Sequence, residues 1–447
     1  MPKQRLSNDE LTTLIDTIKV MAGDKRATST QTLNSDDRQT ASSEFESALS
    51  AYKNKDYKTA YKLFLKEAEK GSAGAQYYIG IMYEYGQGLL QDYKEAIKWY
   101  RLAADQGNTG AQAELGFMYF KGLGTVQDNK EAVKWYMLAA ELGNAVAQYN
   151  LGVIYDTGQG VLQDYKEAVK WYRLAADQGY AGAQTDLGFM YLEGLGTVQD
   201  NKEAVKWFRL AAEQGNAVAQ YNLGIMHHNA LGVLQDYKEA LKWYRLAADR
   251  GNAAAQNNLG NMYVNGQGVL QDYKEAVKWY RLAADQGNAA AQNNLGSMYD
   301  NGQGVLQDSK EAVKWYMLAA EQGNIIAQYN LGVAYDNGQG VLQDYKEAFK
   351  WYKLAAGQGS VEAQNNMALM YADGRGVLRD YNEAVKWYSL AAEKGNATAK
   401  CNLAEMYASG KGVKIDFALA KKLAREGFDE GAPYCETVWG KYNLANH

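Results

Sequence analysis

The chain has few of the residues that interrupt or crosslink helices. Its 447 residues include only two prolines, Pro2 and Pro433, so no proline breaks a helix between them. The two cysteines, Cys401 and Cys435, are too few for a disulfide framework and fit a reducing compartment. They fall on helices of neighbouring repeats. We expect two buried thiols there, with a bridge as the alternative.

Long apolar runs are also missing. No run approaches the roughly 20 residues that a membrane-spanning helix needs. Near the N-terminus, Asp9, Glu10 and Asp16 interrupt the segment where a signal peptide would be uniformly apolar. The sequence therefore predicts no direct membrane insertion. The cytoplasm is the expected compartment, and secretion without a cleaved signal peptide is the alternative.

An excess of positive charge is absent. The chain has 47 Lys and Arg against 52 Asp and Glu, a net charge of -5, whereas a nucleic-acid binder needs a basic stripe. No P-loop, G-x-S-x-G motif or metal-ligand cysteine cluster occurs. We therefore predict no enzyme activity, catalytic residue, cofactor or metal. The pair His227-His228 is interpreted as a diverged repeat rather than a zinc site, because adjacent histidines on a helix project in different directions.

The sequence does contain a strict repeat. Tryptophans recur every 36 residues, at Trp99, Trp135, Trp171, Trp207, Trp243, Trp279, Trp315, Trp351 and Trp387. Such a period indicates a tandem array in which each unit buries its apolar face against its neighbours.

The unit at residues 144–179 predicts two helices. Asn144 can cap the first helix, and Gly158 with Gly160 ends it in a turn. Asp164 can cap the second helix, and Gly179 lies where a helix ends. Apolar residues follow helical spacing in both segments, at Ala147, Leu151, Ile154 and Tyr155 and at Ala168, Trp171, Tyr172 and Ala175. Each unit is therefore predicted to be an antiparallel helical hairpin.

The motif L-G-x-M-Y, together with the tryptophans, carries a family resemblance. It occurs at residues 115–119, 187–191 and 259–263. From about residue 56 to residue 431 the pattern resembles the Sel-one-like repeat family, a subclass of tetratricopeptide-like proteins. The resemblance implies an all-α fold, a right-handed α-solenoid of stacked antiparallel hairpins. It also implies scaffold or adaptor work and, in bacteria, interaction with host or envelope proteins. Some secreted members carry a disulfide in each repeat, and this chain lacks those cysteines.

The ends of the array depart from the repeat. We predict a short amphipathic helix, a flexible linker, a tetratricopeptide-like capping hairpin, the repeat solenoid, and a C-terminal capping helix with a tail. These segments cover residues 1–22, 23–41, 42–71, 72–431 and 432–447, respectively.

A second stripe on the first helix of each hairpin is the candidate binding site. It is offset by two residues from the core stripe, which places it on nearly the opposite side of the helix. The resemblance implies that this side lines the concave groove. Large apolar residues there can anchor a ligand, and asparagines can bond a peptide backbone. The candidate residues are Tyr77, Ile81, Tyr85, Phe117, Phe120, Tyr149, Val153, Phe189, Leu192, Tyr221, Ile225, Asn257, Asn261, Asn265, Asn293 and Asn301.

The stripe leads to a functional hypothesis with alternatives. We expect a non-enzymatic scaffold that holds a peptide or partner protein in the groove. The alternatives are a bacterial effector or host-interaction protein that uses the same groove, and a hydrolase. Packing of adjacent first helices is the other explanation for the apolar residues of the stripe. The sequence leaves the oligomeric state and the identity of the partner undetermined.

Overall fold

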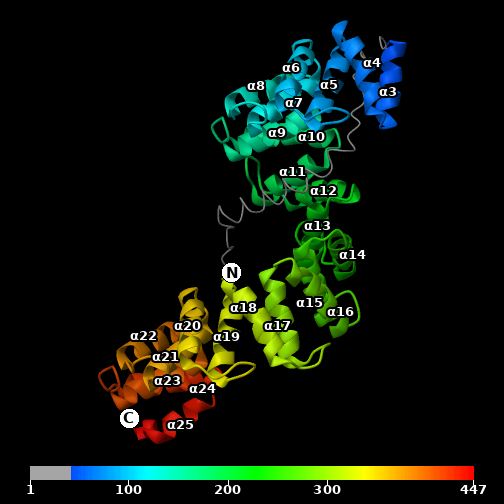
Figure 1. Cartoon of the computed structure of the whole chain (residues 1–447). Helices are drawn as coiled ribbons and strands as arrows, with labels where there is room; N and C mark the ends of the chain where they lie inside the picture. Colours follow the sequence, from blue (N-terminus) through cyan, green and yellow to red (C-terminus); the bar gives the residue numbers. More distant parts are fainter. Residues whose placement is uncertain (1–41, 447) are drawn as a thin grey trace. The chain divides into compact units, whose positions relative to one another are not determined.

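The computed structural model describes residues 42–446, which are helical throughout (Figure 1). Within this range there are 23 α-helices and one short 3-10 helix, and no strand. The all-α repeat fold predicted from the sequence is confirmed. The predicted amphipathic helix at 1–22 and the linker at 23–41 lie outside the described residues.

The helices come in pairs of nearly constant length. Their bounds are α3 (Ser43–Lys53), α4 (Tyr57–Glu69), α5 (Ala73–Tyr85), α6 (Tyr93–Asp105), α7 (Thr109–Lys121), α8 (Asn129–Glu141), α9 (Ala145–Thr157), α10 (Tyr165–Asp177), α11 (Ala181–Glu193), α12 (Asn201–Glu213), α13 (Ala217–Asn229), α14 (Tyr237–Asp249), α15 (Ala253–Asn265), α16 (Tyr273–Asp285), α17 (Ala289–Asn301), α18 (Ser309–Glu321), α19 (Ile325–Asn337), α20 (Tyr345–Gly357), α21 (Val361–Asp373), α22 (Tyr381–Glu393), α23 (Ala397–Ser409), α24 (Phe417–Asp429), α25 (Tyr434–Lys441) and η2 (Leu444–Asn446).

The chain divides into two compact units. One comprises Met1–Ala183 with Leu195–Thr197, and the other comprises Gln184–Gly194 with Val198–His447. Within each unit the two helices of a hairpin pack together, and the second helix of one hairpin packs on the first helix of the next. Each unit is therefore a stack of hairpins.

The predicted helix ends are confirmed. Oδ1 of Asn144 accepts a hydrogen bond from the backbone N–H of Ala147 at 2.9 Å, and Gly158 ends α9 with a φ of 72°. Asp164 caps α10 by accepting from the backbone N–H groups of Lys166 and Glu167. Polar caps thus satisfy backbone groups that a helix terminus leaves unpaired.

A glycine facing a buried aromatic ring sets the distance between the two helices of a hairpin. A Cβ on Gly152 would lie 2.4 Å from the ring of Tyr172, so a side chain at this position would require the ring to shift. Tyr172 is 1% exposed. The same pairing recurs as Gly80–Tyr100, Gly116–Tyr136, Gly188–Phe208, Gly224–Tyr244, Gly260–Tyr280, Gly296–Tyr316 and Gly332–Tyr352.

Buried glutamines tie the hairpins together. Nε2 of Gln148 donates to the carbonyl oxygen of Ala140 in the preceding hairpin at 3.0 Å. Nε2 of Gln178, at the end of the same hairpin, donates to Oε1 of Gln148 at 2.7 Å. Each such glutamine therefore joins its own hairpin to the preceding one.

Three hairpins lack the second glutamine of this pair. Leu142, Arg250 and Lys394 stand at the position of Gln178. Within residues 42–446, the corresponding buried oxygens receive no hydrogen bond: Oε1 of Gln112, Gln220 and Gln364. In the last hairpin an ion pair, Lys400 to Glu430 at 2.5 Å, takes the place of the two glutamines.

The C-terminal cap corrects one expectation. Cys401 on α23 and Cys435 on α25 form a disulfide, with their Cα atoms 4.8 Å apart. The prediction of two separate thiols is therefore wrong. Helix α25 packs against both α23 and α24, and this long-range packing brings the two sulfur atoms together. Gly427 on α24 leaves the necessary space, since a Cβ there would lie 2.6 Å from Sγ of Cys435.

Candidate protein-binding face

The predicted site residues lie on one side of the first helices, which we call the first-helix face. Most of them are half-buried: Tyr77, Ile81, Phe117, Phe120, Tyr149, Val153, Phe189, Leu192, Tyr221, Ile225 and Asn261. Tyr85, Asn265 and Asn301 are exposed, whereas Asn257 and Asn293 are buried at 8% and 7% exposure. The face therefore contributes to packing between hairpins and also reaches the surface.

Aromatic residues of the face pack against neighbouring rings. The ring centroid of Tyr149 lies 5.9 Å from that of the buried Tyr172 and 4.9 Å from that of Tyr180. The ring of Phe189 meets Phe208 edge-on at 5.1 Å. These contacts fix each aromatic ring in place, so a ligand that binds there meets a preformed surface.

An acidic group at the first of these helices was missed by the sequence analysis. Glu84 on α5 is 4% exposed, and Oη of Tyr100 donates to its Oε2 at 2.6 Å. Burial, with the nearby acids Glu84 and Glu114, raises the pKa of Tyr100 well above its usual value. This tyrosine therefore remains a neutral hydrogen-bond donor at physiological pH.

Asparagines of three successive first helices are hydrogen-bonded to one another. Nδ2 of Asn294 donates to Oδ1 of Asn257 at 3.0 Å, and Nδ2 of Asn330 donates to Oδ1 of Asn293 at 3.1 Å. Longer bonds of 3.4 and 3.5 Å join Asn257 to Asn258 and Asn293 to Asn294. We call these five residues the asparagine relay.

The asparagine relay changes the role expected of the asparagines. The predicted Asn257 and Asn293 have their amides engaged inside the protein, whereas Asn265 and Asn301 are exposed on the same face. Sequence reasoning missed Asn258, Asn294 and Asn330, which occupy the adjacent helix position. For Asn258 and Asn294 the signal was the repeated Asn-Asn pair before Leu-Gly, whereas Asn330 follows Tyr329.

The histidine pair belongs to the packing of its hairpin. Nε2 of His227 lies 3.5 Å from a guanidinium nitrogen of Arg209. Between α6 and α7, a guanidinium nitrogen of Arg101 donates to Oη of Tyr119 in the same way, at 2.6 Å. Burial lowers the pKa of His227 and of His228. His227 thus replaces a tyrosine, and residues 42–446 contain no cluster of three His, Cys, Asp or Glu residues suited to a metal.

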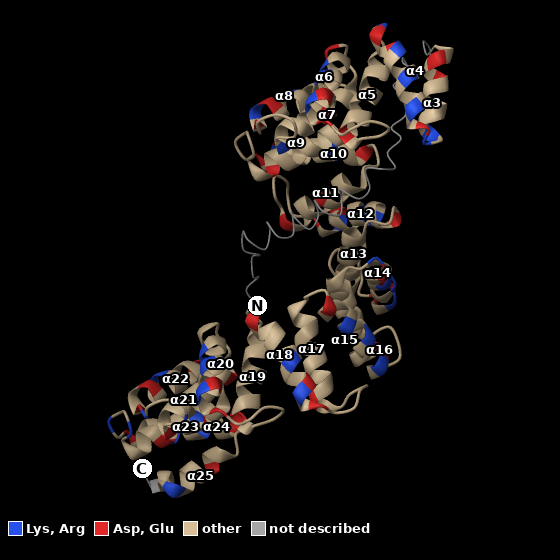
Figure 2. Ribbon diagram, viewed as in Figure 1, with Lys and Arg blue, Asp and Glu red and all other residues tan. Residues whose placement is uncertain are grey.

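Charges on the second helices are paired within each helix. Acidic and basic residues alternate on helices such as α14 (Figure 2). A glutamate and the lysine three residues later form an ion pair in every hairpin from α5/α6 to α21/α22, as Glu167 and Lys170 do at 3.2 Å. Such exposed pairs contribute little stability, and they leave each helix close to neutral.

An exposed aliphatic residue recurs in the loop before each second helix from α6 to α22, which the sequence analysis did not single out. These side chains are 84% to 91% exposed, so the core does not require them. We call them the loop aliphatic residues: Leu90, Val126, Leu162, Val198, Leu234, Leu270, Leu306, Leu342 and Leu378. They form a second exposed apolar surface, which serves as a comparison for the first-helix face.

The described helices are short. In residues 42–446 no helix has the length and apolar character required to cross a bilayer. This agrees with the apolar runs counted in the sequence.

Comparisons with known proteins give a clear family. The Sel1 repeat model matches eleven consecutive segments that together span residues 51–431. The first segment, 51–72, overlaps the hairpin that was predicted as a tetratricopeptide-like cap. A comparison with curated proteins finds no match.

Two solved structures are similar over most of their length. One is c5321, described as a protective antigen present in uropathogenic Escherichia coli strains. It is 33% identical with a TM-score of 0.80, covering 89% of this chain and 91% of that protein. The other is a Sel1 repeat protein from Oxalobacter formigenes, 34% identical with a TM-score of 0.56, covering 69% of this chain and 90% of that protein. The chain belongs to the Sel1 repeat family, whose helical arrays are scaffolds typical of protein–protein interaction.

Proposed function

We propose that this chain is a non-enzymatic scaffold that binds a peptide or partner protein along the first-helix face. The observation that carries the proposal is the set of half-buried aromatic residues on that face. Phe117 and Tyr149 lie in one unit, and Phe189 and Tyr221 lie in the other. Each ring is held by neighbours and still reaches solvent. Aromatic anchors of this kind dominate the binding energy of many protein interfaces.

The rigidity of the hairpins supports this mechanism. Glycine–aromatic pairs and buried glutamines fix the backbone, so little conformational entropy is lost when a ligand binds. The exposed Tyr85, Asn265 and Asn301 add polar and aromatic contacts at the edge of the face.

The test begins with partners captured from the producing organism and continues with measured affinities. Phe117, Tyr149, Phe189 and Tyr221 are each replaced by alanine, alone and in pairs within one unit. We expect at least a tenfold loss of affinity for the pair in the unit that binds. Circular dichroism melting shows whether each variant is folded.

Two further pairs of variants complete the test. Tyr85→Ala and Asn301→Ala remove exposed residues of the face and leave the core intact. Leu162→Ser and Leu306→Ser each remove one of the loop aliphatic residues. Both leucines are 91% exposed, and the two variants serve as the matched control. Unchanged affinity in all folded face variants, with loss in the loop variants, would place binding at the loop edge and contradict the proposal.

A second candidate is a bacterial effector or host-interaction protein that uses the same face. The Cys401–Cys435 disulfide favours it, because such bonds persist in oxidising compartments. The similarity to a protective antigen of uropathogenic Escherichia coli supports it as well. Cell fractionation combined with labelling of free thiols tests this candidate. Protein found only in the cytoplasm, with both thiols free, would contradict it.

A further inference from the structure

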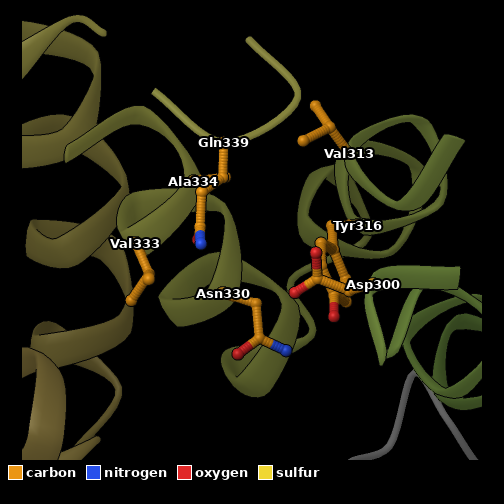
Figure 3. Close-up of a pocket in the computed structure, with 7 residues that line it drawn as sticks. All are labelled: Asp300, Val313, Tyr316, Asn330, Val333, Ala334 and Gln339. Atoms are coloured by element: carbon orange, nitrogen blue, oxygen red, sulfur yellow. The ribbon is translucent and has the colours of Figure 1, made fainter. Parts of the chain in front are cut away.

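One first helix lacks a core side chain that most of the others have. Ala334 on α19 is 5% exposed and stands where Met298 lies on α17 and Met370 lies on α21. A cavity of about 50 Å³ lies beside it (Figure 3). Its lining residues are Asp300, Val313, Tyr316, Asn330, Val333, Ala334 and Gln339.

The cavity persists because its surroundings are fixed. Gly332, two residues before Ala334, packs against Tyr352, and Gln328 on the same helix bonds the carbonyl oxygen of Ala320 at 3.1 Å. A large-to-small change in such a setting leaves a space instead of a collapsed core. A volume of this size has room for roughly three to five water-sized groups.

Both polar and apolar groups line the cavity. Asp300, Asn330 and Gln339 supply oxygen acceptors, and Val313 and Val333 supply apolar walls (Figure 3). Neighbours hold two of the polar groups in place. Oγ of Ser309 donates to Oδ1 of Asp300 at 3.0 Å, and Nδ2 of Asn330 donates to Asn293.

The cavity reaches the first-helix face. Asp300, Asn330 and Val333 are half-buried, so they line the cavity and are also accessible to solvent. Val333 stands at the helix position of Val153 and Phe189, two of the predicted site residues. A side chain projecting from a ligand on this face can therefore enter the cavity.

We propose that the cavity beside Ala334 is a subsite for a protonated primary amine, the head group of a lysine in the bound peptide. A primary ammonium carries three donors and a positive charge, which match the carboxylate and amide oxygens. Its methylene stem matches the two valines. The assignment to a peptide lysine rests on the proposed function, whereas the subsite itself can be tested with small amines.

The test is a titration of the full chain, labelled at alanine and valine methyl groups, followed by NMR. The probes are n-propylammonium, n-propanol and propionate, which share a stem and differ in the head group. We expect saturable shifts of the Val313, Val333 and Ala334 signals with propylammonium, at least tenfold tighter than with the other two. No saturable shift, or equal shifts from the three probes, would overturn the proposal.

Two variants locate the effect, with one substitute and one control. Ala334→Met fills the cavity with the side chain found in neighbouring repeats, and Asp300→Asn keeps the shape while removing the charge. Each is expected to weaken propylammonium binding at least tenfold. Ala334→Val is the substitute if Ala334→Met does not fold. Asp336→Asn, the same helix position one repeat later, is the matched control and should bind as the wild type does.

The two proposals fail in different ways. Propylammonium binding with a partner affinity that no face variant changes would leave the subsite standing and remove the proposed function. Partner binding on the face without amine binding would remove the subsite alone. If both proposals hold, replacing the lysines of the identified peptide one at a time by norleucine should weaken binding at one position only. In the Ala334→Met variant, that replacement should no longer change the affinity.

Discussion

The hairpin α9/α10 and the hairpin α17/α18 share a backbone and differ on the first-helix face. At the same helix position, α9 has Tyr149 against the ring of Tyr180, and α17 has Asn293 hydrogen-bonded to Asn330. One helix presents a fixed aromatic surface and the other an amide network. The chemistry of the face therefore varies without any change in the fold.

The residues that hold the backbone are the same in both hairpins. Gln148 and Gln292 each accept a hydrogen bond at 2.7 Å from the glutamine that ends the hairpin. Gly152 and Gly296 each face a buried tyrosine ring. The positions that hold the backbone are thus separate from the positions whose side-chain chemistry varies along the array.

The largest expected effect tests the shared core. Tyr172→Ala in α9/α10 and Tyr316→Ala in α17/α18 remove rings that are 1% and 5% exposed, and each should cost about 3–5 kcal/mol of local stability. Hydrogen exchange measured by mass spectrometry reports this loss hairpin by hairpin. A much larger loss in one hairpin than in the other would show that the two regions do not share a common core.

The next effect should be confined to the region of the asparagine relay. Asn294→Ala leaves the buried Asn257 and Asn293 without their bond to this residue. We expect a loss of about 1–3 kcal/mol, because unpaired buried amides pay their full desolvation cost. Urea denaturation, monitored by hydrogen exchange of α15 to α19, measures this loss of stability.

Asn301→Ala is the control for the asparagine relay. Asn301 is exposed and bonds Ser297 within its own helix, so its removal should change stability by less than about 0.5 kcal/mol. Equal losses in the two variants would mean that the asparagine relay adds nothing to the stability of the array.

A smaller effect should remove a difference between the hairpins α7/α8 and α17/α18. The hairpin α7/α8 ends in Leu142, which is 62% exposed, whereas α17/α18 ends in Gln322, which bonds Gln292. Leu142→Gln should supply a donor to Oε1 of Gln112 and stabilise the hairpin by about 0.5–1.5 kcal/mol. Thermal melting and hydrogen exchange of α7 measure the gain. Leu138→Gln, on the exposed side of α8, should give no such gain.

The smallest effect depends on pH. Burial raises the pKa of Asp156 on α9 above its ordinary value of 3.8, against the effect of the hydrogen bond from Tyr172. A raised carboxyl pKa favours the folded state at low pH, and that contribution is lost as the pH rises through the folded value. Asp156→Asn should therefore stabilise the protein near neutral pH and have little effect below pH 3.8. Melting curves across this range check the sign, and a gain that grows on acidification would contradict the assignment.

The sequence predicts the hairpins well because their signals are local. The caps Asn144 and Asp164, and the turn at Gly158, act within a few residues of the helix ends that they define. The cavity also had a local signal, since Ala334 interrupts a column of methionines and one isoleucine when the repeats are aligned.

Features that depend on packing between helices escaped prediction. The Cys401–Cys435 bridge requires α25 to lie against α23, and no spacing in the sequence states that contact. The asparagine relay depends on residues 37 positions apart, such as Asn257 and Asn294. The burial of the predicted stripe also depends on how closely the next hairpin packs, which the spacing of its residues does not give.

The asparagine relay has a consequence for folding fidelity. Hairpins with nearly identical cores can stack in the wrong order, or onto a second chain during synthesis. Asn294 and Asn330 meet an amide partner only when the preceding first helix has asparagine at the position of Asn257 and Asn293, and Asn402 bonds Asn365 in the same way. A misplaced neighbour with a tyrosine at this position would bury an amide without its partner. The amides therefore distinguish a preceding repeat that has asparagine at this position from one that has tyrosine, although the cores of the two repeats are nearly identical.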